Sequence, residues 1–270
     1  MTNTPALNDQ DPVLIEYRDD IAIVRLNRPE VSNAVTPAMM ARLCEALDAV
    51  IDNDQVHAIV LSHVGRHFLA GADFSFLHQL ATSDAVHVRN EIYQYFQGAA
   101  RRVHLCKKPV VAAIGGAAVT VGCELAIACD FRIVTENAFF QQSWIKLGLI
   151  GPLGSAKLLP QIVGWAVAKD MMLRARPVRG AEALVLGLAT ELVAESDRES
   201  RAIALAGELA ASPPLAYAAM KEALWQGLEA SFQDCWAGNV LAQALLIGSH
   251  DFKESLAAMK DKRSPSFEGR

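Results

Sequence analysis

Residues 109–128 read PVVAAIGGAAVTVGCELAIA, an apolar run followed by a segment of small residues. The run 110–114 has the length and composition of a buried strand, because all five residues are apolar and three are β-branched. The small residues 115–122 lead from this strand into a helix that we expect to continue through Ala128. A buried strand followed closely by a helix is typical of an α/β fold with parallel strands.

The chain before this stretch repeats the alternation of strand and helix. Two β-rich runs, 13–17 and 21–26, are separated by three polar residues and predict a hairpin. Apolar residues recur at helical spacing over 37–51, after Thr36 as an N-cap and with Pro37 at the first helical position. The other elements expected here are a strand at 58–61, a helix at 85–105 and a strand at 130–135. This alternation predicts an α/β architecture.

After about residue 196 the pattern becomes helical only. We expect helices over 198–210, 214–227, 231–247 and 251–260. We therefore divide the chain into a core of residues 1–200 and a helical region of residues 201–270. The second region is too small and too apolar to be stable alone, so we expect it to pack against another subunit.

Composition narrows the class of protein. The 270 residues are 52% hydrophobic, yet Gly, Arg or Glu interrupts each apolar stretch well before the roughly 18 residues of a membrane span. A net charge of −5 disfavours nucleic acid as a partner, because phosphate binding depends on an excess of Lys and Arg. We expect a soluble protein without membrane or nucleic-acid partners.

The cysteines and the N-terminus indicate the compartment. Five cysteines, an odd number without a CxxC pair or clustering with histidine, argue against a disulfide framework and against a metal site. Residues 1–11 are polar and lack the basic and apolar regions of a secretory signal, so we expect a frayed arm there. A reducing cytoplasm fits these features best.

Two small-residue segments suggest chemistry. FLAGADF at 68–74 lets backbone approach a ligand closely, and AAVTVGCELA at 117–126 runs from a strand end into a helix whose first N–H groups lack intrahelical partners. Two amides converging on one point would stabilise a carbonyl oxygen as it gains charge, which is an oxyanion hole. Simple close packing is the alternative explanation for either segment alone.

With these segments in place, the chain resembles the enoyl-CoA hydratase/isomerase family, the crotonases. The resemblance covers nearly the whole chain and implies a spiral of ββα units, a helical C-terminal trimerisation region, and a homotrimer or dimer of trimers. It implies no cofactor other than the coenzyme A of an acyl-CoA substrate. The motifs, in order, are LNRP at 26–29, Asn33 with Ala34, FLAGAD at 68–73, PVVAAIGG at 109–116, GCELA at 122–126, CD at 129–130 and KRSPSF at 262–267.

The resemblance assigns the oxyanion-hole amides to Ala70 and Val121. The family usually has glycine at the second position, and the β-branched valine here narrows the space beside the thioester. The resemblance implies substrate contacts at Ala70, Gly71, Ala72, Asp73, Val121 and Trp144. It also implies coenzyme A contacts at Arg28, Asn33 and Ala34, and a contact of Lys262 in the C-terminal tail with the coenzyme A of a neighbouring subunit. Asp73 could also be the N-cap of the helix that follows it.

Glu124 is the expected catalytic acid or base, because it lies one helical turn beyond Val121 on the same face. It matches the first of the family's two catalytic glutamates, whereas Trp144 stands where many relatives carry the second. Addition of water to an enoyl double bond is served by two carboxylates, so standard hydratase activity should be weak or absent.

Several activities remain open with a single carboxylate. Glu124 could shuttle a proton between two carbons, as an isomerase does, or act in thioester hydrolysis or decarboxylation. The chain could also be a non-catalytic acyl-CoA binder. Trp144 could donate its indole N–H, form an aromatic wall for the acyl group, or simply pack.

Overall fold

The computed structural model describes residues 11–270. The N-terminal arm that we expected over 1–11 lies, except for Asp11, outside the described residues.

The larger sheet has six strands, all parallel to their neighbours except the first. The predicted hairpin forms the antiparallel pair at its edge, with Val13 opposite Leu26. The expected strand over 130–135 is also present. In spatial order the strands are β1 (Val13–Arg18), β2 (Ile21–Leu26), β3 (Ala58–His63), β4 (Val110–Ile114), β6 (Phe131–Thr135) and β9 (Glu191–Val193).

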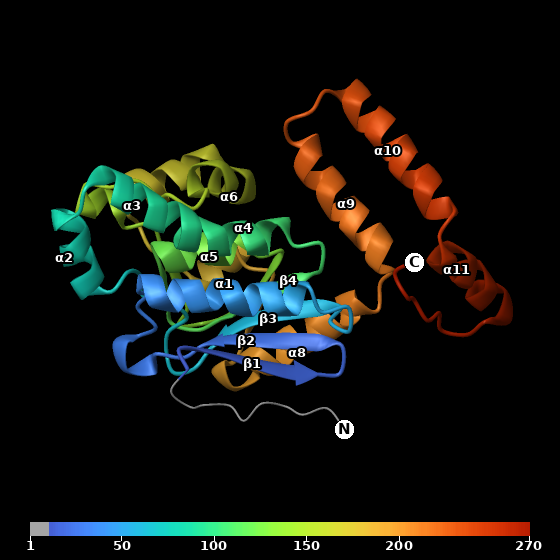
Figure 1. The fold of residues 1–270 in the computed structure, drawn as a ribbon, viewed down its shortest axis with the longest axis horizontal. Coiled ribbons are helices and arrows are strands. Elements are labelled where there is room, and N and C mark those ends of the chain that lie inside the picture. The colour runs from blue at the N-terminus through green and yellow to red at the C-terminus, as the bar shows by residue number, and fades with distance from the viewer. Residues whose placement is uncertain (1–10) are drawn as a thin grey trace.

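Helices cover both faces of this sheet, so its strands are buried (Figure 1). Alternate residues of β2 face opposite ways, with Val24 in the cluster that includes α1 and Ile23 in the cluster that includes α8. Helix α1 begins after Thr36, whose Oγ1 accepts a hydrogen bond from the Met39 N–H at 3.2 Å as predicted. The covering helices are α1 (Pro37–Ile51), α4 (Gly98–Leu105) and α5 (Val121–Ala128) on one face and α8 (Arg198–Ala210) on the other.

A second sheet of three short strands, which the sequence did not predict, lies at the start of α5. Its strands are β5 (Ala117–Val119), β7 (Phe139–Gln141) and β8 (Val178–Arg179). The helix expected over 85–105 is present but contains a π-helical segment, η2 (Ile92–Gln97). The other elements are η1 (Pro29–Val31), α2 (Phe74–Thr82), α3 (Ala85–Glu91), η3 (Trp144–Leu147), α6 (Ser155–Leu173), α7 (Gly180–Val185) and η4 (Glu195–Asp197).

Three C-terminal helices, α9 (Pro214–Gly227), α10 (Phe232–Ile247) and α11 (His250–Asp261), extend away from the core (Figure 1). Helix α8 instead packs on the sheet through Ala202 and Ala206, so the division after residue 200 falls inside a core helix. The helices that leave the core begin at Pro214. Among the described helices, none combines the length and apolarity needed to cross a bilayer.

Candidate active site

The two predicted small-residue segments lie in direct contact. The Leu69 N–H donates to the Ala117 carbonyl, and the Val119 N–H donates to the Leu69 carbonyl, both at 2.9 Å. Two glycines allow this approach: a Cβ on Gly122 would lie 2.4 Å from the Leu69 carbonyl oxygen, and one on Gly71 would lie 2.7 Å from Thr120 Oγ1. The fold therefore brings residues 70 and 121 to the same region, as the oxyanion-hole hypothesis requires.

Val121 begins helix α5, and the residue before it has an unusual backbone conformation. Thr120 has φ 47° and ψ −107°, and its N–H donates to the Gln141 carbonyl at 2.8 Å. A non-glycine residue held in such a region is strained, and strain of this kind is often found at functional sites. The first N–H of a helix has no intrahelical acceptor, and the Val121 N–H has no backbone acceptor within residues 11–270.

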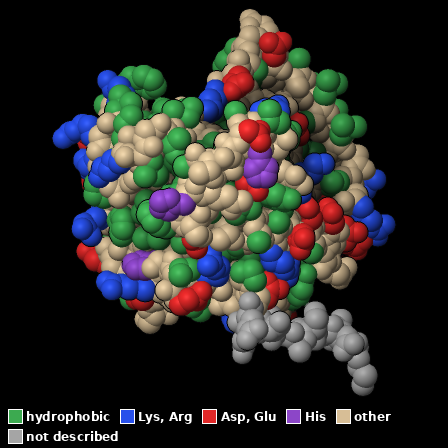
Figure 2. Space-filling model, turned by 60° about the vertical axis from the view of Figure 1, so that its left-hand side comes forward, with side chains coloured by type: hydrophobic (Ala, Val, Ile, Leu, Met, Phe, Trp, Pro, Cys, Tyr) green, Lys and Arg blue, Asp and Glu red, His purple; other side chains and the backbone are tan. Residues whose placement is uncertain are grey.

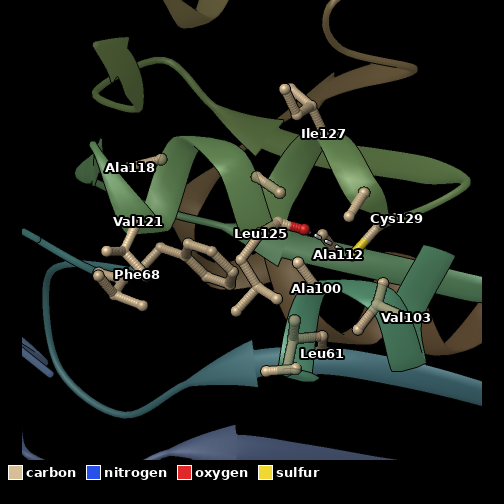
Figure 3. Packing of buried hydrophobic residues seen from close by; sticks show 14 of the residues in the cluster. Leu61, Phe68, Ala100, Val103, Ala112, Ala118, Val121, Leu125, Ile127 and Cys129 are labelled. Carbon is tan, nitrogen blue, oxygen red and sulfur yellow. Dashed lines mark hydrogen bonds between the residues drawn. The ribbon is translucent and has the colours of Figure 1, made fainter. Parts of the chain in front are cut away.

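The Val121 side chain is buried rather than projecting into solvent. It lies beside Phe68 and Ala118 in the apolar core (Figure 3). The valine at this position thus packs on the first segment, while its N–H remains available at the positive end of the α5 dipole.

The second predicted donor is already engaged in this structure. The Ala70 N–H donates to the Ser32 carbonyl at 3.1 Å. Ser32 is the C-cap of η1 and has a left-handed conformation, with φ 57°. A thioester oxygen bound between residues 70 and 121 would therefore have to displace the Ser32 carbonyl from the Ala70 N–H, or share that N–H with it.

Glu124 is fully enclosed, with 0% of its surface exposed. Its Oε2 accepts a hydrogen bond from the Leu153 N–H at 3.2 Å, and its Oε1 accepts one from the Ser155 N–H at 3.1 Å. Burial raises the pKa of Glu124 to about 7, against the lowering effect of the hydrogen bonds from Ser155 and Leu153. A carboxyl group with this pKa can both take and return a proton near neutral pH.

The loop before α6 closes over this carboxylate. Gly151 lies so near that a Cβ on it would be 2.4 Å from Glu124 Oε1. Gly148 and Gly154, on either side, have left-handed φ values of 69° and 109°. This loop was not predicted from the sequence, although three glycines and Pro152 directly before a helix are a visible signal of a constrained turn.

Trp144 is buried, with 9% of its surface exposed, and its indole Nε1 has no hydrogen-bond partner among the described residues. Burial alternates along this stretch, so Phe140, Gln142 and Trp144 share one side. Burial raises the pKa of the Cys123 thiol in α5 to about 12, and the nearby Gln142 amide opposes this rise. Trp144 thus supplies no group that exchanges protons near neutral pH.

Comparisons with known proteins show the family of this chain. The family model of enoyl-CoA hydratase/isomerase matches residues 16–270. The chain belongs to the enoyl-CoA hydratase/isomerase family. It is accordingly an enzyme that acts on acyl-CoA, and its fold is the crotonase fold.

The relatives of this family member include enzymes with different reactions. A crotonyl-CoA hydratase of Syntrophomonas wolfei is 30% identical, over 94% of this chain and 97% of the relative. A peroxisomal Δ(3,5)-Δ(2,4)-dienoyl-CoA isomerase of Arabidopsis thaliana is 31% identical, over 94% and 95% of the two chains. The crystal structure of an enoyl-CoA hydratase from Bacillus anthracis superposes with a TM-score of 0.89 at 28% identity, covering 96% and 100%.

The segments that the resemblance assigns to coenzyme A lie partly together in this crotonase. Val35 pairs with Ala72, so the loop holding Asn33 and Ala34 runs beside the 70–73 segment. The Arg28 guanidinium donates to the Ala34 carbonyl at 2.6 Å and pairs with Asp73 at 3.3 Å.

Three of the predicted contacts have structural partners or lie elsewhere. The Asn33 side chain is fully buried and donates to the carbonyls of Val64 and His67, at 3.0 and 2.7 Å, so it holds the loop in shape. Asp73 caps α2 through the Ser75 N–H at 3.0 Å. Lys262 follows α11, which lies far from α2 (Figure 1), so its predicted contact with the coenzyme A of a neighbouring subunit stays a prediction.

The surface near the 70–73 segment carries exposed apolar groups. Figure 2 brings forward the end of the molecule with α2 and α3, where green side chains lie among charged ones. Phe74 and Val86 are 76% and 68% exposed. One surface cavity, of about 1000 Å³, is lined by residues of α1, η2 and α4 and includes none of Ala70, Val121 and Glu124.

Proposed function

We propose that this family member moves a proton between carbons of an acyl-CoA thioester, in the manner of an isomerase, with Glu124 as its one acid and base. The observation that carries the proposal is the enclosed carboxylate of Glu124, whose pKa of about 7 suits transfer in both directions. Coenzyme A enters as part of the substrate, and we propose no further cofactor.

The proposed reaction begins at the thioester oxygen. The Val121 N–H donates a hydrogen bond to this oxygen. The Ala70 N–H leaves the Ser32 carbonyl and donates to the thioester oxygen as well. Ionised Glu124 takes a proton from a carbon next to the carbonyl or its double bond, and the C–H electron pair moves toward the thioester oxygen. Returning the proton to another carbon regenerates the carboxylate and shifts the double bond.

Trp144 argues against standard hydration. Hydration requires one group to activate water and another to manage the proton at the α-carbon, and an indole performs neither role near neutral pH. We propose that its buried indole contributes an aromatic wall to the acyl site.

A non-catalytic acyl-CoA binder is the second candidate. Two features of the ligand-free structure favour it. Glu124 accepts hydrogen bonds from two backbone amides, and the Ala70 N–H donates to the Ser32 carbonyl. If neither contact opens when the ligand binds, the chain can hold a thioester but cannot transfer protons.

One experiment separates these functions. The protein is incubated in deuterated water with enoyl-, aryl- and malonyl-CoA esters, and the products are followed by mass spectrometry. Deuterium incorporation or a shifted double bond, lost in Glu124→Gln, supports the proposal. Hydrated product as the main outcome refutes it, tight binding without exchange favours the binder, and free coenzyme A or carbon dioxide indicates hydrolysis or decarboxylation.

We also propose that the enzyme is a cytoplasmic homotrimer or dimer of trimers. The support is the apolar surface of the C-terminal helices, since α10 has no buried residue among those described. Sedimentation velocity should show one of these two assemblies, and a monomer would refute the proposal. The most exposed apolar residues there are Met220, Leu224, Phe232, Trp236, Val240, Leu241, Leu245 and Met259.

A further inference from the structure

A π-helical segment opposite the Glu124 loop is held firmly in place. This segment, η2, joins α3 to α4, and π-turns within helices occur frequently at functional sites. Its Phe96 is buried and stacks on Phe76 of α2 with ring centroids 5.4 Å apart. The Cys44 thiol of α1 donates to the Tyr95 carbonyl at 3.4 Å. Two neighbouring helices therefore fix the backbone of η2.

The last residue of η2 reaches the loop that closes over Glu124. Gln97 Nε2 donates to the Pro152 carbonyl at 2.6 Å. A carbonyl oxygen can only accept, so the amide nitrogen of Gln97 must face it. Pro152 directly precedes Leu153, whose N–H donates to Glu124.

We infer that Gln97 is a positioning residue for Glu124, acting through Pro152 on the loop whose Leu153 and Ser155 amides hold the carboxylate. This inference rests on the proposed function only for its catalytic consequence, because the hydrogen bonds concern the free protein.

The loop needs such an anchor because the hydrogen bonds at its two ends are to nearby residues, from the Gly148 N–H to Ile145 and from the Lys157 N–H to Gly154. It is bounded by Gly148 and Gly154, which both have left-handed backbone conformations. Its Ile150 is 85% exposed and therefore contributes little packing. The carbonyl of Pro152 gives the loop a fixed point on a separate, rigid helix.

Loss of the anchor should loosen the loop and admit water to Glu124. Because burial is the largest cause of the raised pKa of Glu124, water entry should lower that pKa from about 7. A displaced carboxylate should also reduce kcat, while KM for the acyl-CoA stays close to that of the parent, because no coenzyme A contact is changed.

The test compares Gln97→Leu, which keeps the size of the side chain but removes the donor, with Gln94→Leu. Gln94 lies on the same segment, is exposed, and makes no recorded contact with the loop. Amide hydrogen exchange in the ligand-free protein should be on the order of fivefold faster at Leu153 and Ser155 in Gln97→Leu. The control should exchange like the parent.

Activity gives the second readout. Gln97→Leu should lower kcat on the order of tenfold with KM unchanged, and move the lower midpoint of the kcat–pH profile to a more acidic value. Gln97→Glu tests the donor itself. At pH 8 its carboxylate should repel the Pro152 carbonyl and make exchange faster than in the parent, whereas at low pH its protonated form should donate and bring exchange back to that of the parent at the same pH.

The outcomes distinguish the two proposals. Parent-like exchange and an unchanged pH midpoint in Gln97→Leu would overturn the positioning role. Faster exchange without a change in kcat or the pH midpoint would also overturn it, because the bond would then be merely structural. Retained turnover in Glu124→Gln would instead refute the proposed function, whatever Gln97 does.

Discussion

The two positions that the resemblance marks for catalytic carboxylates, 124 and 144, are both buried in this enzyme but differ in their hydrogen bonds. Glu124 is fully enclosed, and both of its oxygens accept backbone hydrogen bonds. Trp144 is similarly buried, but its indole N–H has no acceptor in the described part of the chain. The difference teaches that the fold supplies hydrogen-bond partners to the side chain at position 124 and only packing to the one at position 144.

Replacing the Glu124 carboxylate should reduce turnover more than any other substitution proposed for these two positions. Glu124→Gln should reduce turnover by about 10² to 10⁴-fold, because that is the usual contribution of a general acid or base. Steady-state kinetics with the best substrate of the CoA-ester panel would measure it. The exposed Glu136→Gln is the matched control and should turn over like the parent.

Gly151→Ala should disturb the geometry of the same site while leaving the Glu124 carboxyl group in the sequence. The new Cβ would lie 2.4 Å from Glu124 Oε1, so the carboxylate or the loop must move. A misplacement of about 1 Å can cost about 10²-fold in rate, and we expect a loss of that size in kcat. Gly238→Ala, where a Cβ meets nothing within 4 Å, should leave kcat unchanged.

The pH dependence of stability should reveal the buried carboxyl group. Its pKa is about 7 in the folded chain and 4.5 ordinarily, so the folded state binds the extra proton. The stabilisation of the folded state by this protonated carboxyl group is fully present below about pH 4.5 and is lost as pH rises through about 7. Urea unfolding should show that Glu124→Gln gains roughly 2–3 kcal/mol relative to the parent between pH 5 and pH 9. A constant difference would mean that Glu124 titrates at its ordinary pKa.

Trp144→Phe should have the smallest effect. It removes the indole N–H and keeps an aromatic ring, so the free energy of unfolding should change by less than about 1 kcal/mol. Proton transfer should persist, because Glu124 performs it. A stability loss above about 2 kcal/mol in chemical denaturation would show that the indole N–H has a partner, such as a bound water.

Much of the fold could be predicted because its signals are local. Thr36 and Pro37 marked the start of α1, and the uninterrupted apolar run at 110–114 marked β4. The three short strands of the second sheet escaped prediction, because two- and three-residue strands show no periodicity. The π-helical turn in the 85–105 helix was equally invisible in the sequence pattern; its Phe96 stacks on Phe76, which is distant in sequence.

The candidate site was predictable as a set of residues but not as a set of contacts. Composition and spacing indicated two segments with free amides, and the structure brings them together. Three contacts depend on long-range geometry that a sequence pattern does not encode: the Ala70 N–H on Ser32, the loop amides on Glu124, and Gln97 on Pro152.

The most direct test of the central claim is a crystal structure with a slowly reacting acyl-CoA thioester bound. We predict that the thioester oxygen lies within hydrogen-bond distance of the Ala70 and Val121 nitrogens, with the Ser32 carbonyl displaced and Glu124 facing the carbons beside the carbonyl. A thioester oxygen bound elsewhere, or a Glu124 still closed off by the 148–154 loop, would contradict the account.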